Sequence, residues 1–180
     1  YIFVEGAGSE AERRNKKKLG VPSEALGVDE RRIVLDIVNY ILQGKHPNLT
    51  LDDNGLLKIE GKNVPMTWMN ATEDGKPITP RTGYVVEINA LWYNALCFAS
   101  ALAANPALAT SPELEAQAQK TAESFVNTFW NGLYLYDYVD GDYKDVEVRP
   151  NMILAVSMPY SPLSRQQQKS VLDVCTRELL

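Results

Sequence analysis

The sequence predicts an all-α fold of paired helices joined by long loops, with one small β hairpin. Apolar residues recur at helical spacing in four or five segments, the pattern expected of amphipathic helices. No strand–helix–strand alternation is visible, so a parallel sheet is not expected. Long polar connections separate the helical segments. They favour helical hairpins arranged in an array or toroid, with function on the loops.

The first predicted helix follows an N-terminal segment of weak pattern. Residues 1–28 are expected to be poorly ordered or partly helical, so we place the domain at residues 29–180. Asp29 can cap the helix and Gly44 can close it; its apolar residues are Ile33, Val34, Ile37, Val38, Ile41 and Leu42. Residues 52–55 predict a turn, followed by a short extended piece.

A long polar segment precedes the second helix. Residues 67–83 contain Gly75, Pro77 and Pro80 and show no helical period, which is typical of a functional or disordered segment. Residues 85–104 are apolar nearly all round and predict a helix buried on most sides.

The C-terminal part predicts further helices and the hairpin. Ser111, Pro112 and Glu113 open a helix that Asn131-Gly132 closes. Aromatic and polar residues around Asp140-Gly141 indicate a small hairpin or extended arm. A short buried helix is expected at residues 152–158, and Ser164 with Gln167 forms a capping box for the last helix.

Composition excludes several classes of function. The net charge of -5 argues against a sequence-independent nucleic-acid binder, and the basic run at residues 13–18 is interpreted as a solvated face. No apolar stretch is long enough to span a membrane, so a soluble, cytoplasmic protein is expected. His46 is the one histidine and stands in a turn-like segment, while Cys97 and Cys175 lie in apolar contexts. We therefore expect free thiols, no metal site and no cofactor.

The most distinctive stretch, residues 65–96, has the composition of a sugar site. Flat aromatic surfaces can stack on pyranose rings, and oriented amides and charges can bind hydroxyls. The aromatic candidates are Trp68, Trp92 and Tyr93, and the polar candidates are Asn70, Arg81, Glu87, Asn89 and Asn94. Trp92 and Tyr93, taken singly, are more often core residues than ligand platforms. Glu87 fits either an ion pair with Arg81 or a contact with substrate.

Three motifs in this stretch and beyond it resemble the glucosidase domain of glycogen-debranching enzymes. They are Thr67-Trp68-Met69-x-Ala71, Thr79-Pro80-Arg81-x-Gly83 and the run VEINALWYNAL at residues 86–96. The resemblance extends to residues 53–56, 148–151 and 155–157, and so covers most of residues 33–180.

The resemblance implies part of a six-hairpin (α/α) toroid that hydrolyses α-1,6-linked glucose at glycogen branch points without a cofactor. Related glycosidases use an inverting pair of carboxyl groups. The family's general acid is the aspartate of the first motif, where this chain has Asn70. The resemblance also implies a catalytic base beyond Leu180, so the chain is expected to be a segment of a longer enzyme and inactive alone.

The same resemblance assigns the remaining site residues. Arg81 and Glu87 would organise the subsite and Trp68 and Trp92 would stack on glucose; the other substrate-binding candidates are Asn89, Tyr93, Arg149 and Asn151. The expected partner is glycogen limit dextrin or another α-glucan, with neither nucleic acid nor membrane. Apolar faces left exposed at the edges are expected to produce a homo-oligomer.

Asn70 leaves three explanations open, because an amide has no titratable proton to deliver. Glu73, Asp74 or another nearby carboxylate can be the acid; the chain can be a glucan-binding relative that has lost hydrolysis; or the residue is altered. A non-catalytic glucan-binding module is therefore the second hypothesis for the whole chain. A third, a helical interaction domain, predicts that Trp68 and Trp92 are both buried.

Overall fold

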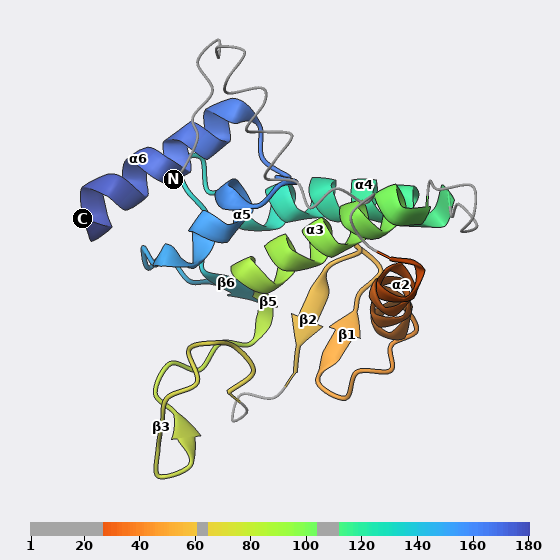
Figure 1. Ribbon diagram of the computed structural model, residues 1–180. Helices are drawn as coiled ribbons and strands as arrows, with labels where there is room; N and C mark the ends of the chain where they lie inside the picture. Colours follow the sequence, from red (N-terminus) through yellow and green to blue (C-terminus); the bar gives the residue numbers. More distant parts are fainter. Residues whose placement is uncertain (1–26, 61–64, 104–111) are drawn as a thin grey trace.

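The computed structural model describes residues 27–60, 65–103 and 112–180 (Figure 1). The prediction for residues 1–28 therefore lies almost wholly outside the described residues. In chain order the elements are α2 (Val28–Leu42), β1 (Leu49–Leu51), β2 (Leu57–Ile59), β3 (Thr72–Glu73), β4 (Lys76–Pro77), β5 (Gly83–Val85), α3 (Val86–Ala103), α4 (Pro112–Phe129), β6 (Tyr138–Asp140), β7 (Tyr143–Lys144), the 3-10 helix η2 (Pro150–Ile153), α5 (Leu154–Ser157) and α6 (Arg165–Leu179).

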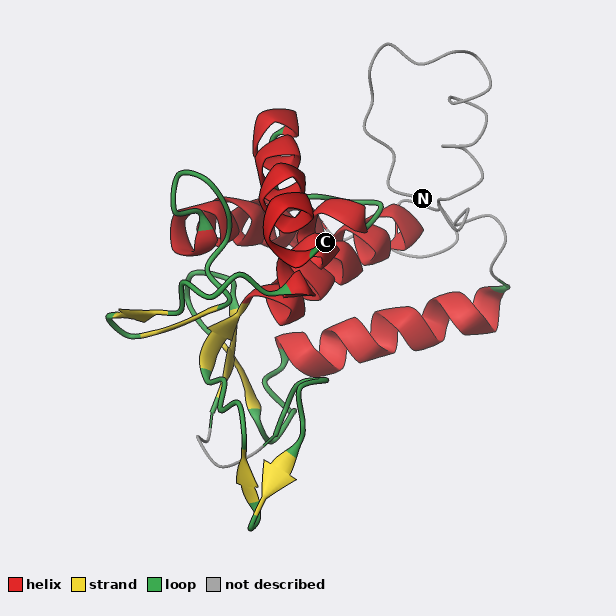
Figure 2. Ribbon diagram, turned by 90° about the vertical axis from the view of Figure 1, so that its left-hand side faces the viewer, coloured by secondary structure: helices red, strands yellow, loops and turns green. Residues whose placement is uncertain are grey.

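The predicted all-α class is wrong, because the described residues also form two antiparallel sheets. One has five strands in the order β1-β2-β5-β6-β7, and the other is the β3–β4 pair. Each strand is only two or three residues long, too short for an alternating pattern to be read. The central ladder also joins distant residues, since Ile59 pairs with Gly83 and Val85 with Tyr138. Figure 2 shows these strands beside the helices.

The predicted helices are present with small shifts at their ends. The first begins at Val28 with Gly27 as its N-cap, so Asp29 lies inside the first turn instead of capping it. Ser164 and Gln167 form the predicted capping box of α6. The segment predicted as a short helix begins as η2 and continues as α5. None of the helices in the described part of the chain is long and apolar enough to cross a bilayer.

Both hairpins rest on turns that glycine favours. The predicted hairpin at Asp140-Gly141 is confirmed as β6–β7, with Gly141 at φ 61°. The β3–β4 hairpin lies in the segment predicted to be irregular. It turns at Asp74 and Gly75, whose φ values are 49° and 76°, as a two-residue hairpin turn requires. This second hairpin projects away from the helices (Figures 1 and 2).

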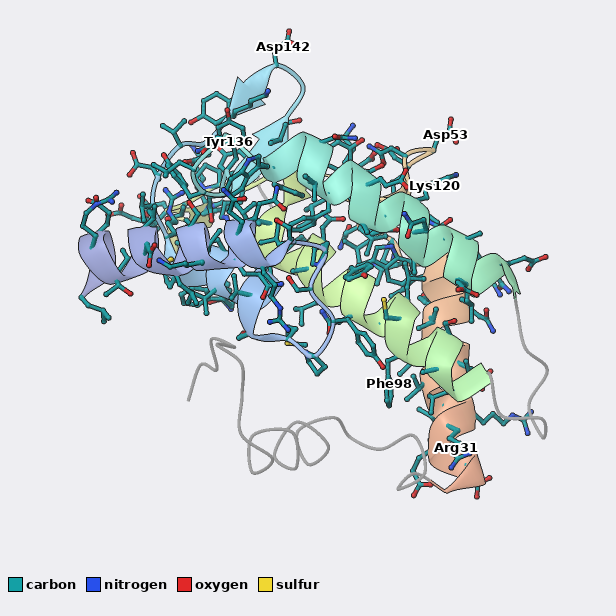
Figure 3. All side chains as sticks on the ribbon, turned by 90° about the horizontal axis from the view of Figure 1, so that it is seen from above. Arg31, Asp53, Phe98, Lys120, Tyr136 and Asp142 are labelled. Atoms are coloured by element: carbon teal, nitrogen blue, oxygen red, sulfur yellow. The ribbon has the colours of Figure 1, made fainter. Side chains whose placement is uncertain are left out.

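Helix α3 is the centre of the packing, which explains its apolar residues on nearly every side. It contacts α2, α4, α5 and η2. One core cluster contains Phe125, Phe129, Leu135 and Met152, and a second surrounds Trp92 and Leu96 and includes Val38 from α2. Figure 3 shows α4 lying along α3, with Lys120 of α4 near Asp53 of the β1–β2 turn. The Lys120 Nζ donates to the Asp53 carbonyl oxygen at 3.2 Å.

Gly83, the glycine of the second motif, allows β5 and β6 to pair closely. Its φ is 74°, and a Cβ at this position would lie 2.3 Å from the carbonyl oxygen of Val139. Side chains larger than hydrogen are therefore excluded on both conformational and steric grounds. The motif's glycine thus helps to fix Arg81, two residues earlier in the chain.

Candidate functional site

Arg81 and Glu87 meet at the junction where β5 runs into α3. Both side chains are buried, and the guanidinium binds the carboxylate through two parallel contacts, Nη1 to Oε1 at 2.5 Å and Nη2 to Oε2 at 2.7 Å. This two-pronged geometry is the strong form of an arginine–carboxylate pair. Of the two alternatives for Glu87, the ion pair is confirmed, and a contact with substrate stays a prediction.

Asp137, which immediately precedes β6, joins Arg81 to the second arginine. Its Oδ1 accepts from Arg81 Nη2 at 2.8 Å, and its Oδ2 accepts from Arg149 Nη1 at 2.9 Å. Arg81 Nε also lies 2.7 Å from Oδ2, an ionic contact in which the N–H makes no hydrogen bond. Asp145 completes the arrangement, because its Oδ2 accepts from Arg149 Nη1 at 3.1 Å. We call Arg81, Glu87, Asp137, Asp145 and Arg149 the charged cluster.

The charged cluster holds both arginines in their cationic form. Burial by itself lowers the pKa of Arg81, but the hydrogen bonds and charges of Glu87 and Asp137 outweigh it and raise the pKa. Burial likewise opposes the rise in the pKa of Arg149, which Asp145 and Asp137 produce. Two guanidinium and three carboxylate groups therefore face each other in a mostly buried space. Such a network fixes geometry, because each charge depends on its partners.

Trp68 connects the charged cluster to the surface. Its side chain is 64% exposed, and its Nε1 donates to Oδ1 of the buried Asn151 at 2.9 Å. Asn151 Nδ2 donates in turn to Asp137 Oδ1 at 2.6 Å. Thr67 is also linked, since its Oγ1 accepts from Arg81 Nη1 at 3.4 Å. The predicted residues Trp68, Arg81, Glu87, Arg149 and Asn151 are therefore brought together.

Asn70 lies two residues beyond Trp68 and is exposed. Glu73 and Asp74, the alternatives proposed for the acid, are exposed on the projecting β3–β4 hairpin. Within the described residues, no group of three His, Cys, Asp or Glu side chains is placed to hold a metal ion.

Three predicted residues on α3 lie outside this arrangement. Trp92 is 2% exposed, and its Nε1 donates to the Gly55 carbonyl oxygen at 3.2 Å. Asn89 is fully buried and bonds the backbone of Leu57 through both its oxygen and its nitrogen. Tyr93 is described below. The hypothesis of a helical interaction domain predicts that both tryptophans are buried. Trp92 is buried as this hypothesis predicts, but Trp68 is exposed.

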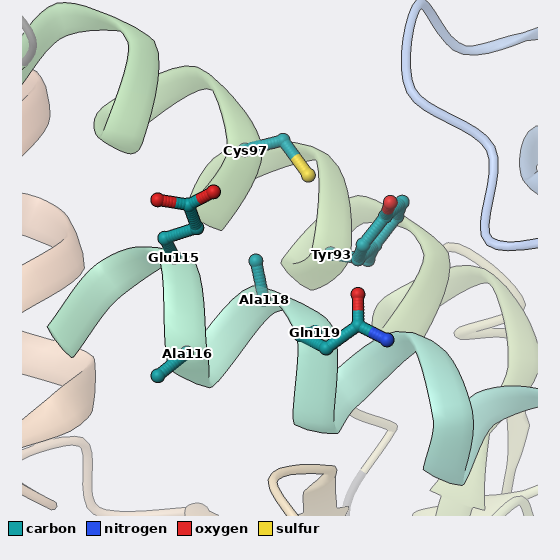
Figure 4. A pocket seen from close by; sticks show the side chains of 6 residues that line it. All are labelled: Tyr93, Cys97, Glu115, Ala116, Ala118 and Gln119. Carbon is teal, nitrogen blue, oxygen red and sulfur yellow. The ribbon is translucent and has the colours of Figure 1, made fainter. Parts of the chain in front are cut away.

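Tyr93 lines a groove of about 520 Å³ between α3 and α4 (Figure 4). The other lining residues are Cys97, Glu115, Ala116, Ala118 and Gln119. Burial and the neighbouring Cys97 raise the pKa of the Tyr93 phenol to about 12. Cys97 is half-buried, Cys175 is buried, and both thiols are free, as predicted. Asn94 is occupied elsewhere, since its amide bonds the backbone of Tyr160.

Sequence reasoning missed Asp137 and Asp145. The signal for Asp137 was present in the run from Tyr134 to Val139, where alternate residues face inward: Leu135, Asp137 and Val139 are buried. An aspartate at an inward position of such an alternation needs a cationic partner. Asp145 was missed because Arg149, its partner, was interpreted as a substrate-binding residue and not as a member of an ion pair.

The chain was compared with known proteins. The family model described as amylo-alpha-1,6-glucosidase matches residues 14–180. No curated protein matches the chain.

Proposed function

Since the chain belongs to the amylo-alpha-1,6-glucosidase family, we propose that the surface formed by Trp68, Asn70 and the underlying charged cluster binds a glucose residue at an α-1,6 branch of an α-glucan. Family membership supports the substrate class. The local geometry supports the position, because it combines an exposed aromatic face with oriented polar groups.

The observation that carries this proposal is the state of Trp68. The indole of Trp68 is 64% exposed, so its face is available to a ligand. This indole is also held by a hydrogen bond to a buried amide instead of rotating freely. A pre-oriented aromatic face beside hydrogen-bonding groups is the usual composition of a sugar site.

Each remaining residue has a role that follows from its contacts. Arg81 and Glu87 join the segment containing Trp68 to α3, since Arg81 contacts both Glu87 and Thr67. Arg149 and Asn151 form the adjacent wall through their bonds to Asp137. Asn70 occupies the position of the family's acid, and its amide can donate a hydrogen bond to a glycosidic oxygen but cannot protonate it.

We therefore propose that the chain binds glucan without appreciable hydrolysis of its own. The alternative, a working glucosidase, needs another carboxyl group in the place of the missing acid. An Asn70→Asp variant separates the two. In residues 1–180 alone the variant should stay inactive, because the resemblance places the catalytic base beyond Leu180. In the full-length enzyme, if position 70 keeps the acid's geometry, glucose release from limit dextrin should rise by about 10² to 10⁴-fold relative to the full-length wild type. A wild type that is already active, with no gain in the variant, assigns the acid to another carboxylate.

Binding is tested by titrating the chain with panose, which carries an α-1,6 linkage, and with cellobiose, which lacks any α linkage. Panose should bind and cellobiose should not. Trp68→Ala should weaken panose binding, while Tyr143→Ala, which removes an equally exposed aromatic ring from β7, should not. Equal losses in both variants would remove Trp68 from the site.

We also propose self-association through α2. Ile33, Ile37 and Tyr40 are exposed and lie at helical spacing on one face of this helix. Sedimentation equilibrium should show a dimer for the wild type and a monomer for Ile37→Glu. A wild type that stays monomeric at high concentration contradicts this proposal.

A further inference from the structure

Asp137 is the side chain that joins the two arginines of the charged cluster, and its main chain is fixed as well. It is 2% exposed. Its backbone N–H donates to the Asp145 carbonyl oxygen at 3.0 Å, and its own carbonyl oxygen accepts from Val86 N at 3.1 Å. The carboxylate is therefore anchored both to the β6–β7 hairpin and to the start of α3.

The carboxylate of Asp137 has partners on both oxygens. It receives hydrogen bonds from Arg81 Nη2, Arg149 Nη1 and Asn151 Nδ2, and an ionic contact from Arg81 Nε. Since Asp137 is also only 2% exposed, it influences a ligand through the residues that it holds.

Asn151 is the residue through which Asp137 reaches the surface. Its amide has a donating end and an accepting end, and its neighbours decide which way it points. The negative charge of Asp137 requires the Nδ2 end, which leaves Oδ1 to accept from Trp68 Nε1. A reversed amide would set its oxygen against the carboxylate and its NH₂ against the indole N–H. The charge of Asp137 thus fixes the acceptor that holds the indole.

We propose that Asp137 is a positioning residue that orients the Trp68 ring for stacking on glucan, acting through Asn151. The inference rests on the proposed function for its ligand, but the orientation of the indole is a property of the chain alone. Apolar contacts cannot replace this relay, because only a hydrogen-bond acceptor selects the Nδ2 end of the amide.

The experiment replaces Asp137 by Asn, which keeps the shape and removes the charge. The readouts are the indole N–H signal of Trp68 by NMR, assigned from its loss in Trp68→Phe, and the affinity for panose. We expect Asp137→Asn to move the Trp68 signal and to weaken panose binding on the order of tenfold, the effect of losing one well-oriented aromatic contact. The signal of Trp92, bonded to the Gly55 carbonyl oxygen, should stay in place.

Asn151→Leu provides a second variant in case Asp137→Asn does not fold. It leaves Asp137 with both arginines and removes the relay, together with the weak 3.5 Å contact from Asn151 Nδ2 to Met69 Sδ, so it should reduce panose affinity to a similar extent. The matched control is Asn94→Leu. This amide is equally buried but bonds the backbone of Tyr160, so its loss should lower stability while the Trp68 signal and the affinity stay at wild-type values.

Two failures are distinguishable. A wild-type chain that binds no panose overturns the proposed function, and with it the ligand named here. A wild type that binds panose, together with an Asp137→Asn or Asn151→Leu variant of unchanged affinity, overturns the positioning role and leaves the proposed function standing.

Discussion

Replacing Arg81 and Glu87 singly and together tests whether the charged cluster is coupled as its geometry indicates. Arg81→Met leaves Glu87 buried without its two-pronged partner, while Asp137 keeps Arg149 and Asn151. Removing one partner of a buried pair typically costs about 3 to 5 kcal/mol of unfolding free energy. Glu87→Leu should cost roughly 3 kcal/mol, the low end of this range, because Arg81 retains Asp137.

The double variant should cost less than the sum of the two. With both side chains apolar, no charge of the pair is left alone, and Asp137 still has two donors. We therefore expect a coupling energy of about 2 to 3 kcal/mol, at the upper end for residues in contact. Urea denaturation of the four proteins measures it, provided that the slope of free energy against denaturant is unchanged.

The control cycle uses Lys169 and Asp173 on α6, an ion pair 2.6 Å apart whose side chains are 65% and 60% exposed. Exposed pairs of this kind typically contribute about 0.2 to 1 kcal/mol. If the Arg81–Glu87 cycle gives a coupling as small as this surface pair, the two buried charges are not mutually dependent. The reasoning about the charged cluster would then be wrong.

Three further predictions concern backbone, helix capping and ionisation. Gly83→Ala should unfold the protein or destabilise it severely, because its Cβ would lie 2.3 Å from the Val139 carbonyl oxygen. The control is Gly132→Ala, at φ 102° with open space around it, which should lower the free energy of unfolding by only about 1 to 3 kcal/mol in a denaturation experiment. Ser164→Ala should lower the free energy of unfolding by about 1 kcal/mol, since it removes the capping box of α6. Burial and Asp52 raise the pKa of Tyr84 from 10.0 to about 12. The stability that the protonated phenol of Tyr84 contributes is therefore complete below pH 10 and is lost as the pH rises toward 12. Tyrosinate absorbance and stability, followed against pH in wild type and Tyr84→Phe, test this.

The helices could be predicted from the sequence because their signals are local. Periodic apolar residues predicted α2, α3 and α4. The capping box that Ser164 forms with Gln167, three residues later, predicted the start of α6. The sheet could not be predicted in this way. Its strands supply two or three residues each, and its register depends on pairings such as Val85 with Tyr138, which only tertiary packing brings together.

The candidate site was predictable where one motif contains both partners. Arg81 and Glu87 are six residues apart, and their pairing was among the alternatives for Glu87. Asp137 was missed because it pairs across 56 residues. Trp68 and Trp92 were both stacking candidates in the sequence, and Trp92 was also weighed as a core residue. The structure separates them, since one bonds an amide at the surface and the other bonds the Gly55 carbonyl oxygen inside the core.

The free-energy cost of burying the charged cluster indicates that its role is to position Trp68 and not to stabilise the fold. Apolar residues of similar volume often stabilise a core as well as a buried ion network does, or better by about 1 to 4 kcal/mol. Stability alone therefore does not account for a mostly buried cluster of five charged groups. Apolar packing suffices for Trp92, which is enclosed on all sides, but Trp68 lies largely in solvent and has few neighbours to hold it. Its orientation depends on the bond to Asn151, and that bond depends on a charge below it. The Arg81→Met/Glu87→Leu double variant keeps the bonds that link Asp137, Asn151 and Trp68 and removes the bond from Arg81 to Thr67. A Trp68 signal that stays in place in this variant therefore assigns the orientation of the indole to the relay. Asp137→Asn should move the signal.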